Sequence, residues 1–534
     1  MGFFKKHKDT VLTIAGAGMF LLGIAVVLFY IFKRCRSEFN ADFTDTILWA
    51  NAAVKSGRYF DPSYWYAYFL PFSGTLLMIP IVSALGLTYF AHQLGMALFA
   101  VIFAVALFVL MKTMDCTYAE SFGLSGIVMI FMCSSQITRM IFYGHIIHYS
   151  LAIVFMCFAF AMLKKSDIFD PGSRRGLIFT VLIAVFCMLC TTNGVATLLL
   201  FFIPFFMSVV LERYFDARPI TLKDDAKLIK SLAIIAAGAL VGVMIKFVFF
   251  SSSEYENSIT ALLPSDGWVW KQSPFVLEWI KVLTDDSPTD VLMQSFSGIR
   301  ILTMYMLALL LLVIPVFAAF FYRVIKYRML RLLILFYWVM FATTLLSYSV
   351  SYASVSNWRL AGLVCAALIL SLLYILYMLK EQLLVRWFVP VAAFFVPALF
   401  IAMLSVKNIP SAQNTNMTDQ LIQLYDENSL TRGYSSSFWN SANSANVLSD
   451  GRISVSPITI NTDGTYEVRR YQSEPSGYED VEGVDRYFVV VDPQDMEFAA
   501  DTLGANAVET IKYRDDIYIW VFDRNIFSDL EPVF

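Results

Sequence analysis

The stretch NADFTDTILWANAAVKSGRYFDP occupies residues 40–62 and follows the first hydrophobic run of the chain, residues 11–32. The run is long enough to cross a bilayer. Just beyond it the stretch carries two aspartates, Asp42 and Asp45. Acidic side chains within or beside apolar segments are rare and mark functional sites by default. The stretch therefore predicts a membrane-embedded fold and a polar site at the membrane surface.

Residues 42–55 separate into two faces when they are placed on a helix at about 100° per residue. The apolar face consists of Phe43, Ile47, Ala50 and Val54. The opposite face consists of Asp42, Asp45, Trp49 and Ala52. This pattern predicts an amphipathic helix on the membrane with its carboxylates turned from lipid. An aromatic run, YFDPSYWYAYF, follows and favours a pocket wall; alternatively, Asp42 caps the helix and Asp45 complements its dipole.

The composition of the chain is that of a membrane protein. Of its 534 residues, 58% are hydrophobic and 15% are charged, whereas soluble domains are about 45–50% apolar and 25% charged. The apolar residues gather near 11–32, 70–86, 91–111, 121–138, 147–163, 176–192, 195–211, 231–250, 299–321, 332–350, 360–379 and 387–406. The net charge of −3 predicts no nucleic-acid partner. The seven cysteines all precede residue 407, so the polar tail does not depend on disulfides.

Positive charge in the loops assigns the orientation. Lysine and arginine gather in loops 164–175, 212–230 and 322–331, which are predicted to be cytoplasmic. The longer 251–298 loop has two lysines and is predicted to be extracytoplasmic. Run 70–86 contains two prolines and a glycine near its start and middle, so we expect a re-entrant or surface-lying segment.

The resulting prediction is a polytopic α-helical membrane protein with about eleven crossings. Its N-terminus is cytoplasmic, its first outer loop spans residues 33–90, and its C-terminus is extracytoplasmic. Lys33, Arg34 and Arg36 then lie outside, against the positive-inside rule.

The tail has a different composition from the rest of the chain. We expect a transmembrane domain over 1–407 and an extracytoplasmic α/β domain over 408–534. β-Branched and aromatic residues predict strands at 452–460, 486–491 and 516–522, and helices are expected at 417–428 and 493–504.

Two further polar clusters fall on the same predicted outer face. Residues 139–150, RMIFYGHIIHYS, contain His145 and His148 at a spacing that places both on one helical face, suited to a metal or a phosphate. Alternatively, these are interfacial, hydrogen-bonded histidines. The 251–298 loop carries Glu254, Glu256 and Trp268, which either close over a polar substrate or belong to an interfacial belt.

Arginines on this face are candidates for gripping a phosphate, or they extend along apolar surface toward water. They are Arg34, Arg139, Arg300 and Arg359.

The segment ADFTD followed by WANAAVKSGRYFDP resembles the first outer loop of the GT-C superfamily of membrane glycosyltransferases. Protein O-mannosyltransferases and the aminoarabinose transferase of lipid A are similar. Counting back from Gly57, the catalytic aspartate of the family falls on Asp42, and Asp45 lies one turn on. FYGHIIHYS stands where the family has its second acidic motif, so His145 and His148 replace carboxylates. FLPFSGTLL resembles the family's substrate-binding proline segment.

The resemblance implies transfer of a sugar from a polyprenyl-phosphate donor to a glycan, lipid or protein of the bacterial cell envelope. Asp42 would act as general base, with Asp45 as its partner or substitute. The arginines named above would neutralise the departing lipid phosphate. The implied substrate-binding residues are His145, His148, Trp49, Glu254, Glu256 and Trp268. Mg or Mn, held by Asp42, Asp45, His145 and His148, is a candidate cofactor.

Two other classes of function compete with this one. A transporter or lipid flippase would predict internal repeats and charges at mid-membrane, and the sequence shows neither. A non-catalytic scaffold that binds envelope polymer would tolerate replacement of Asp42, whereas a transferase would not.

Overall fold

The structure is a computed structural model, and it describes residues 8–166, 168–169, 174–216, 222–250, 261–285, 291–381, 388–409, 416–438, 441–514 and 517–528. The chain forms two compact units. The first comprises Met1–Tyr30, Phe99–Phe249 and Asn257–Ile409, and the second comprises Ile31–Leu98, Phe250–Glu256 and Pro410–Phe534. The first outer loop therefore packs with the tail, far from it in sequence.

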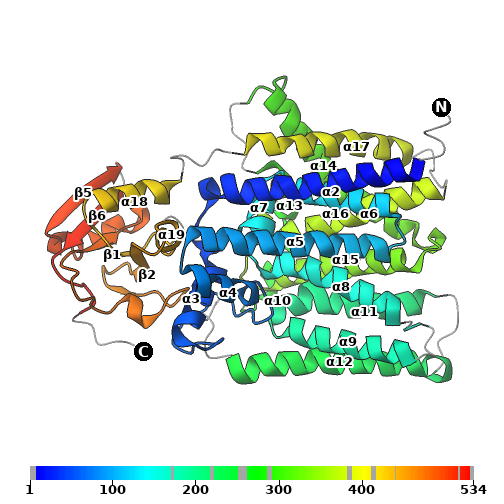
Figure 1. Cartoon of the computed structure of the whole chain (residues 1–534), viewed down its shortest axis with the longest axis horizontal. Helices are drawn as coiled ribbons and strands as arrows, with labels where there is room; N and C mark the ends of the chain where they lie inside the picture. Colours follow the sequence, from blue (N-terminus) through cyan, green and yellow to red (C-terminus); the bar gives the residue numbers. More distant parts are fainter. Residues whose placement is uncertain are drawn as a thin grey trace. The chain divides into compact units, whose positions relative to one another are not determined.

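Long helices that run side by side build the first unit (Figure 1). Three of them, α2, α5 and α12, have an end that belongs to the second unit. The helices are α2 (Lys8–Lys33), α5 (Tyr89–Thr113), α6 (Tyr118–Phe131), α7 (Gln136–Arg139), α8 (His148–Ser166), α9 (Arg174–Thr191), α10 (Val195–Thr197), α11 (Ile203–Phe215), α12 (Leu222–Phe250), α13 (Phe275–Thr284), α14 (Phe296–Phe320), α15 (Arg328–Val350), α16 (Asn357–Lys380) and α17 (Phe388–Leu404).

The described residues contain eight helical spans long and apolar enough to cross a membrane, or nine if a bent pair counts as one span. The predicted polytopic class is therefore confirmed. The predicted count of eleven is reached if the shorter apolar helices α9 and α17 also cross. A third short helix, α4 (Thr75–Leu85), has 11 residues. At about 1.5 Å per residue it is too short for a hydrocarbon core of about 30 Å, as expected for run 70–86.

The bent pair lies in the run predicted at 121–138. Helix α6 ends at Phe131, and Gln136–Gly144 continues at an angle of 113° to it. Ser135 caps the new segment, because its hydroxyl accepts a hydrogen bond from the backbone N–H of Thr138 at 3.2 Å. The second half contains a π-helical turn, Met140–Gly144, a conformation often found at functional sites.

A six-stranded sheet forms the centre of the tail (Figure 1). Its order is β3-β2-β1-β4-β6-β5; β1 is parallel to β2 and β4, and the other pairs are antiparallel. The elements of the tail are α18 (Met417–Glu427), β1 (Arg432–Ser435), α19 (Ser444–Leu448), β2 (Ser454–Ile460), β3 (Tyr466–Val468), β4 (Tyr487–Val490), α20 (Met496–Ala499), β5 (Glu509–Arg514) and β6 (Ile517–Phe522). The predicted α/β class is confirmed.

The three predicted strands and helix 417–428 are present as β2, β4, β6 and α18. The helix predicted over 493–504 is wrong in extent, because only a 3₁₀ turn and the four-residue α20 form there. Beyond α20, the hydroxyl of Thr502 donates to the carbonyl of Gly464 at 2.8 Å. This contact fixes the segment after α20 against the turn at Gly464.

The first loop and the tail are joined by specific polar contacts. Arg36 donates to both carboxylate oxygens of Asp419, at 2.7 Å from Nη2 and 3.0 Å from Nε. The amide of Asn416 donates to the carbonyl of Arg36 at 2.8 Å. Trp65 and Ser473 form an antiparallel bridge, with the N–H of Trp65 donating to Ser473 at 2.8 Å. These bonds fix the first loop against the sheet domain.

Replacing Asp419 by Asn is expected to loosen this junction. The bidentate, charge-assisted pair is half-buried, so its loss should lower the free energy of unfolding by about 1–2 kcal/mol. Thermal melting and limited proteolysis of the tail in detergent would measure the effect. Asp426→Asn is the matched control, because its partner Arg452 is 59% exposed and exposed pairs contribute about 0–1 kcal/mol. Equal losses of stability in the two variants would contradict the role of the Arg36–Asp419 pair in holding the first loop to the tail.

Candidate functional site

The segment with the two acids forms two helices rather than one. Asn40 starts a 3₁₀ turn, Ala41–Thr44, and its side chain accepts a hydrogen bond from the N–H of Asp42 at 3.0 Å. Helix α3 then runs over Asp45–Ser56 and ends at Gly57, whose φ of +66° suits glycine. The cap is therefore Asn40, and the alternative role of Asp42 as helix cap is wrong.

Most of the apolar stripe of this segment faces protein, and Val54, its last residue, is 37% exposed. Phe43, Ile47 and Ala50 are fully buried, and α3 packs against α4. Ala41 packs against Phe438 of the tail. The predicted amphipathic helix on the membrane surface is thus corrected, because the tail and the rest of the first loop cover the stripe.

Trp49 is buried in the same packing. Its indole N–H donates to the carbonyl of Tyr59 at 3.0 Å. Its ring lies 4.9 Å from the rings of both Tyr66 and Phe69. At 1% exposure, Trp49 holds α3 to the aromatic run, and the structure gives it no face toward a substrate.

Asp42 and Asp45 have unusual acidities. Burial raises the pKa of Asp42 from 3.8 to about 7. The pKa of Asp45 is also raised to about 7, first by burial and then by the negative charge of Asp42. Within the described part of the chain, neither carboxylate has a hydrogen bond or ion pair. The two acids therefore titrate as a coupled pair near neutral pH, the range in which a carboxylate is an effective proton acceptor.

Residues of the first loop and of the tail surround the pair. The charge of Asp45 acts on Tyr64, and the charges of both acids act on Tyr471. Thr44, next to Asp45, donates from its hydroxyl to the amide oxygen of Gln472 at 3.2 Å. No local pattern predicts that Tyr471 and Gln472 lie near the pair, because more than 400 positions separate Gln472 from Thr44.

A second cluster, in the first unit, is cationic. His148 lies within electrostatic range of His145, Arg359 and Lys246. All four side chains are at least nine-tenths buried. His145 is extended and follows the π-helical turn, while His148 begins α8, so the predicted common helical face is wrong.

Lys246 was missed by sequence reasoning. It is the lysine of the apolar run 231–250, and a charge in such a run is a signal for function. Gly194, with φ +88°, makes room for it: a Cβ on this residue would lie 2.9 Å from the ammonium nitrogen. The guanidinium of Arg359 lies 4.6 Å from the ring of Trp358 and donates to the carbonyl of Ser354 at 2.5 Å. The four side chains, called the cationic cluster below, form a buried site whose positive charge comes from Lys246 and Arg359.

The other predicted arginines lie apart from this cluster or have other contacts. Arg139 is buried, donates to the carbonyl of Cys133 at 3.1 Å and lies over the ring of Tyr30. Arg300 is partly exposed near the start of α14, and Arg34 is partly exposed after α2.

The predicted acidic and aromatic loop is described in part. Trp268 is 38% exposed, and its indole donates to the carbonyl of Leu263 at 2.8 Å. Glu254 and Glu256 lie outside the described residues.

No group of three or more His, Cys, Asp or Glu among the described residues is placed to hold a metal ion. We therefore assign no step to a metal, and the Mg or Mn ion stays a prediction.

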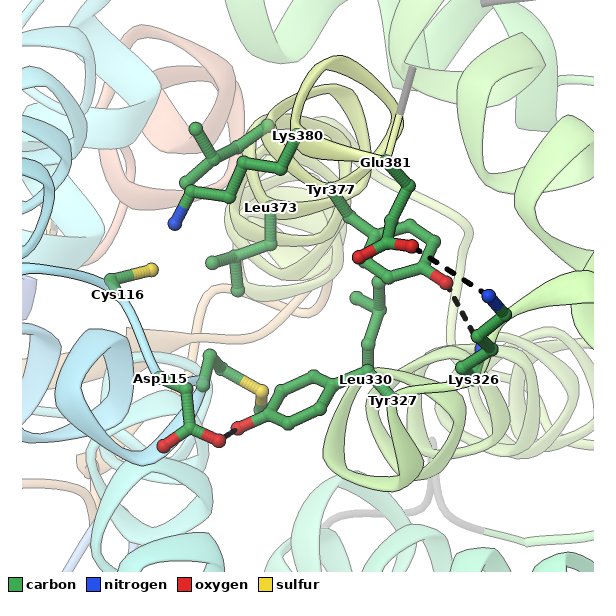
Figure 2. A pocket seen from close by; sticks show the side chains of 11 residues that line it. Asp115, Cys116, Lys326, Tyr327, Leu330, Leu373, Tyr377, Lys380 and Glu381 are labelled. Carbon is green, nitrogen blue, oxygen red and sulfur yellow. Dashed lines mark hydrogen bonds and ion pairs between the residues drawn. The ribbon is translucent and has the colours of Figure 1, made fainter. Parts of the chain in front are cut away.

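A cavity of about 280 Å³ lies among the loops predicted to be cytoplasmic (Figure 2). Its charged groups already have partners: Asp115 is bonded to Tyr327 and Lys164, and Lys326 lies 4.0 Å from Glu381. Burial raises the pKa of the Cys116 thiol to about 11, so it is protonated at neutral pH. This cavity lacks the chemistry that the acid pair offers.

Comparison with known proteins identifies solved structures with a similar fold. No protein-family model and no curated protein matches the chain. Among solved structures, ArnT from Cupriavidus metallidurans in the apo state superposes with a TM-score of 0.52 at 11% identity, over 95% of this chain and 98% of ArnT. The same protein bound to undecaprenyl phosphate gives a TM-score of 0.51 at 12% identity, over 96% and 98%.

The chain has the fold of ArnT, a GT-C enzyme. The ArnT fold extends over the helices and the tail alike, because the superposition covers nearly all of both chains. The resemblance expected from residues 40–62 is thus confirmed for the fold.

The acid pair should make the stability of the protein depend on pH. The folded pKa values of about 7 lie above the ordinary aspartate value of 3.8, so the folded chain binds more protons than the unfolded chain between these values. Its stability therefore falls as pH rises through this window. We expect Asp42→Asn to raise the melting temperature relative to wild type at about pH 8 and to change it little at about pH 4. Val54→Leu, a neutral change on the same helix, should show no such difference, and a pH-independent effect of Asp42→Asn would contradict the raised pKa.

Proposed function

We propose that the chain is a membrane glycosyltransferase of the GT-C type, which moves a sugar from a polyprenyl-phosphate donor to an acceptor of the cell envelope. The observation that carries the proposal is the Asp42 and Asp45 pair, with pKa values near 7, at the position to which the motif resemblance assigns the base. The ArnT fold supports the same reaction class, and one ArnT structure holds undecaprenyl phosphate. The basic loops favour the extracytoplasmic face for the reaction.

Asp42 is the proposed general base. Its carboxylate takes the proton of the acceptor hydroxyl as the oxygen forms a bond to the anomeric carbon. The bond between that carbon and the phosphate oxygen breaks on the opposite side, and the phosphate leaves with the electron pair, so the configuration inverts. Asp45, whose pKa is raised by burial and by the charge of Asp42, titrates together with it.

The cationic cluster is the proposed site for the donor phosphate. Buried cations attract the negative charge of a phosphate more strongly than cations in water do. Arg359 can bond two phosphate oxygens at once, while Lys246 acts as a point charge. His145 and His148 can donate hydrogen bonds to the remaining oxygens.

Asp42→Asn is expected to lower kcat/KM for sugar transfer about a hundredfold to ten-thousandfold, because the base is lost. In the wild type, the rate should rise with pH and level off above the apparent pKa near 7. Transfer in nanodiscs with a lipid-phosphate sugar and an envelope extract would measure both. Asp61→Asn, which changes an acid of the same loop that bonds Ser63, should keep full activity. The proposal fails if Asp42→Asn and Asp45→Asn both transfer sugar at the wild-type rate.

Lys246→Met is expected to weaken binding of undecaprenyl phosphate about tenfold or more, since a buried charge partner of the phosphate is removed. Native mass spectrometry of the full chain in detergent, titrated with that lipid, would measure it. Lys230→Met is the matched control on α12, because Lys230 is exposed and lies about 24 Å along the helix. Equal affinity of the two variants would exclude Lys246 from the donor site.

A further inference from the structure

A cavity of about 310 Å³ lies within the second unit, next to the acid pair. Its volume is at the lower end of the range for small-molecule sites, roughly 300–1,000 Å³. Helix α3, the aromatic run and the tail each contribute to its wall. The residues used below are Asn51, Tyr64, Asn446, Gln472 and Glu474.

The wall is rich in neutral polar groups. Asn51, Asn446 and Gln472 supply side-chain amides, and several serines of the tail supply hydroxyls. Lys55 and Glu474 lie 2.6 Å apart, so their charges neutralise each other. Arg432 also lies on the wall, where its guanidinium donates to the hydroxyl of Ser454 and the carbonyl of Ser476. Amides and hydroxyls both donate and accept hydrogen bonds, which matches a ligand made of many hydroxyl groups.

Tyr64 provides an independent sign of a ligand. Its side chain is 3% exposed, and its hydroxyl has no hydrogen-bond partner among the residues that the structure describes. Tyr66, two residues on, is equally buried, but its hydroxyl accepts from the N–H of Asp61 at 2.9 Å and lies 3.1 Å from the Asp61 carbonyl. Buried hydroxyls nearly always have a hydrogen-bond partner. The hydroxyl of Tyr64, on the cavity wall, is therefore available to form a hydrogen bond with a bound ligand.

The cavity also adjoins the proposed base. Tyr64 is within electrostatic range of both Asp45 and Glu474. Gln472, on the cavity wall, accepts a hydrogen bond from Thr44, the neighbour of Asp45. A ligand in the cavity would therefore have a hydroxyl near the acid pair.

We propose that this cavity binds a saccharide unit of the acceptor. Its role as acceptor site rests on the proposed function, whereas saccharide binding itself does not. Tyr64 and Asn51 bond the sugar hydroxyls, and the tail thereby selects the acceptor. The same saccharide can belong to a soluble glycan or to the head of a glycolipid.

Tyr64→Phe and Tyr66→Phe form the first test. Saturation-transfer NMR on the full chain in detergent, without donor, would measure binding of hexoses, N-acetylhexosamines and their disaccharides. Tyr64→Phe should weaken binding about tenfold while the melting temperature of the free protein stays the same or rises, because an unpaired hydroxyl is removed. Tyr66→Phe should lower the melting temperature and leave saccharide affinity unchanged. If Tyr64 had a merely structural role, Tyr64→Phe would lower the melting temperature and leave saccharide affinity unchanged.

Asn51→Leu and Val54→Leu form the second test. Asn51→Leu fills the cavity and should abolish binding, whereas Val54→Leu, on the same helix outside the cavity, should not. The proposal is overturned if none of the saccharides binds the wild type, or if Asn51→Leu and Tyr64→Phe bind as the wild type does. Saccharide binding without any sugar transfer would reject the proposed function and keep the cavity site. The affinities of each free saccharide and of its lipid-linked form, compared in nanodiscs, show whether the bound saccharide belongs to a soluble glycan or to a glycolipid.

Discussion

The packing of the tail onto the first loop is the constraint on which the site depends. Ala41 lies against Phe438, the bridge between Trp65 and Ser473 fixes the aromatic run, and Arg36 holds Asp419. These contacts take the acid pair out of bulk water. The raised pKa values of Asp42 and Asp45 follow from that burial and are not a property of the local sequence.

The same packing explains a basic cluster that the positive-inside rule does not predict. Arg36 follows a membrane span on the side assigned to the outside, yet its charge is neutralised by Asp419 and its guanidinium lies 5.2 Å from the ring of Tyr89. The positive-inside rule applies to solvated cations in loops. A cation whose charge is neutralised by a contact within the folded protein does not indicate which side of the membrane it lies on. Arg36 is therefore a structural residue, and it is unsuited to hold a donor phosphate.

Local patterns predicted the elements of this fold, and contacts distant in sequence decided the site. Apolar runs and β-branched strands are recognised from patterns among neighbouring residues. The sequence therefore predicts α18, β2, β4 and β6. Strand β1, with its glycine, and the three-residue β3 carry weak local signals and were missed. The apolar stripe is expected to face lipid because nothing near Ile47 in the sequence indicates that other parts of the protein bury it. The arrangement of His145 and His148 was missed because a π-helical turn interrupts the helix that their spacing suggests.

The tail contributes to the surroundings of both the acid pair and the cavity. The packing of the tail onto the first loop is therefore thermodynamically linked to ligand binding and to ionisation of the acids. Any ligand that binds the assembled cavity stabilises the assembled second unit by mass action. The acids oppose this assembly when they are ionised, because burying a negative charge costs free energy. A ligand hydroxyl that bonds Tyr64 or a carboxylate offsets part of that cost. The unit is thus least stable in the ionisation state that base catalysis requires, and it gains most from a ligand in that state. A buried acidic site of this kind is what a fold retains for function and would lose if stability alone were selected.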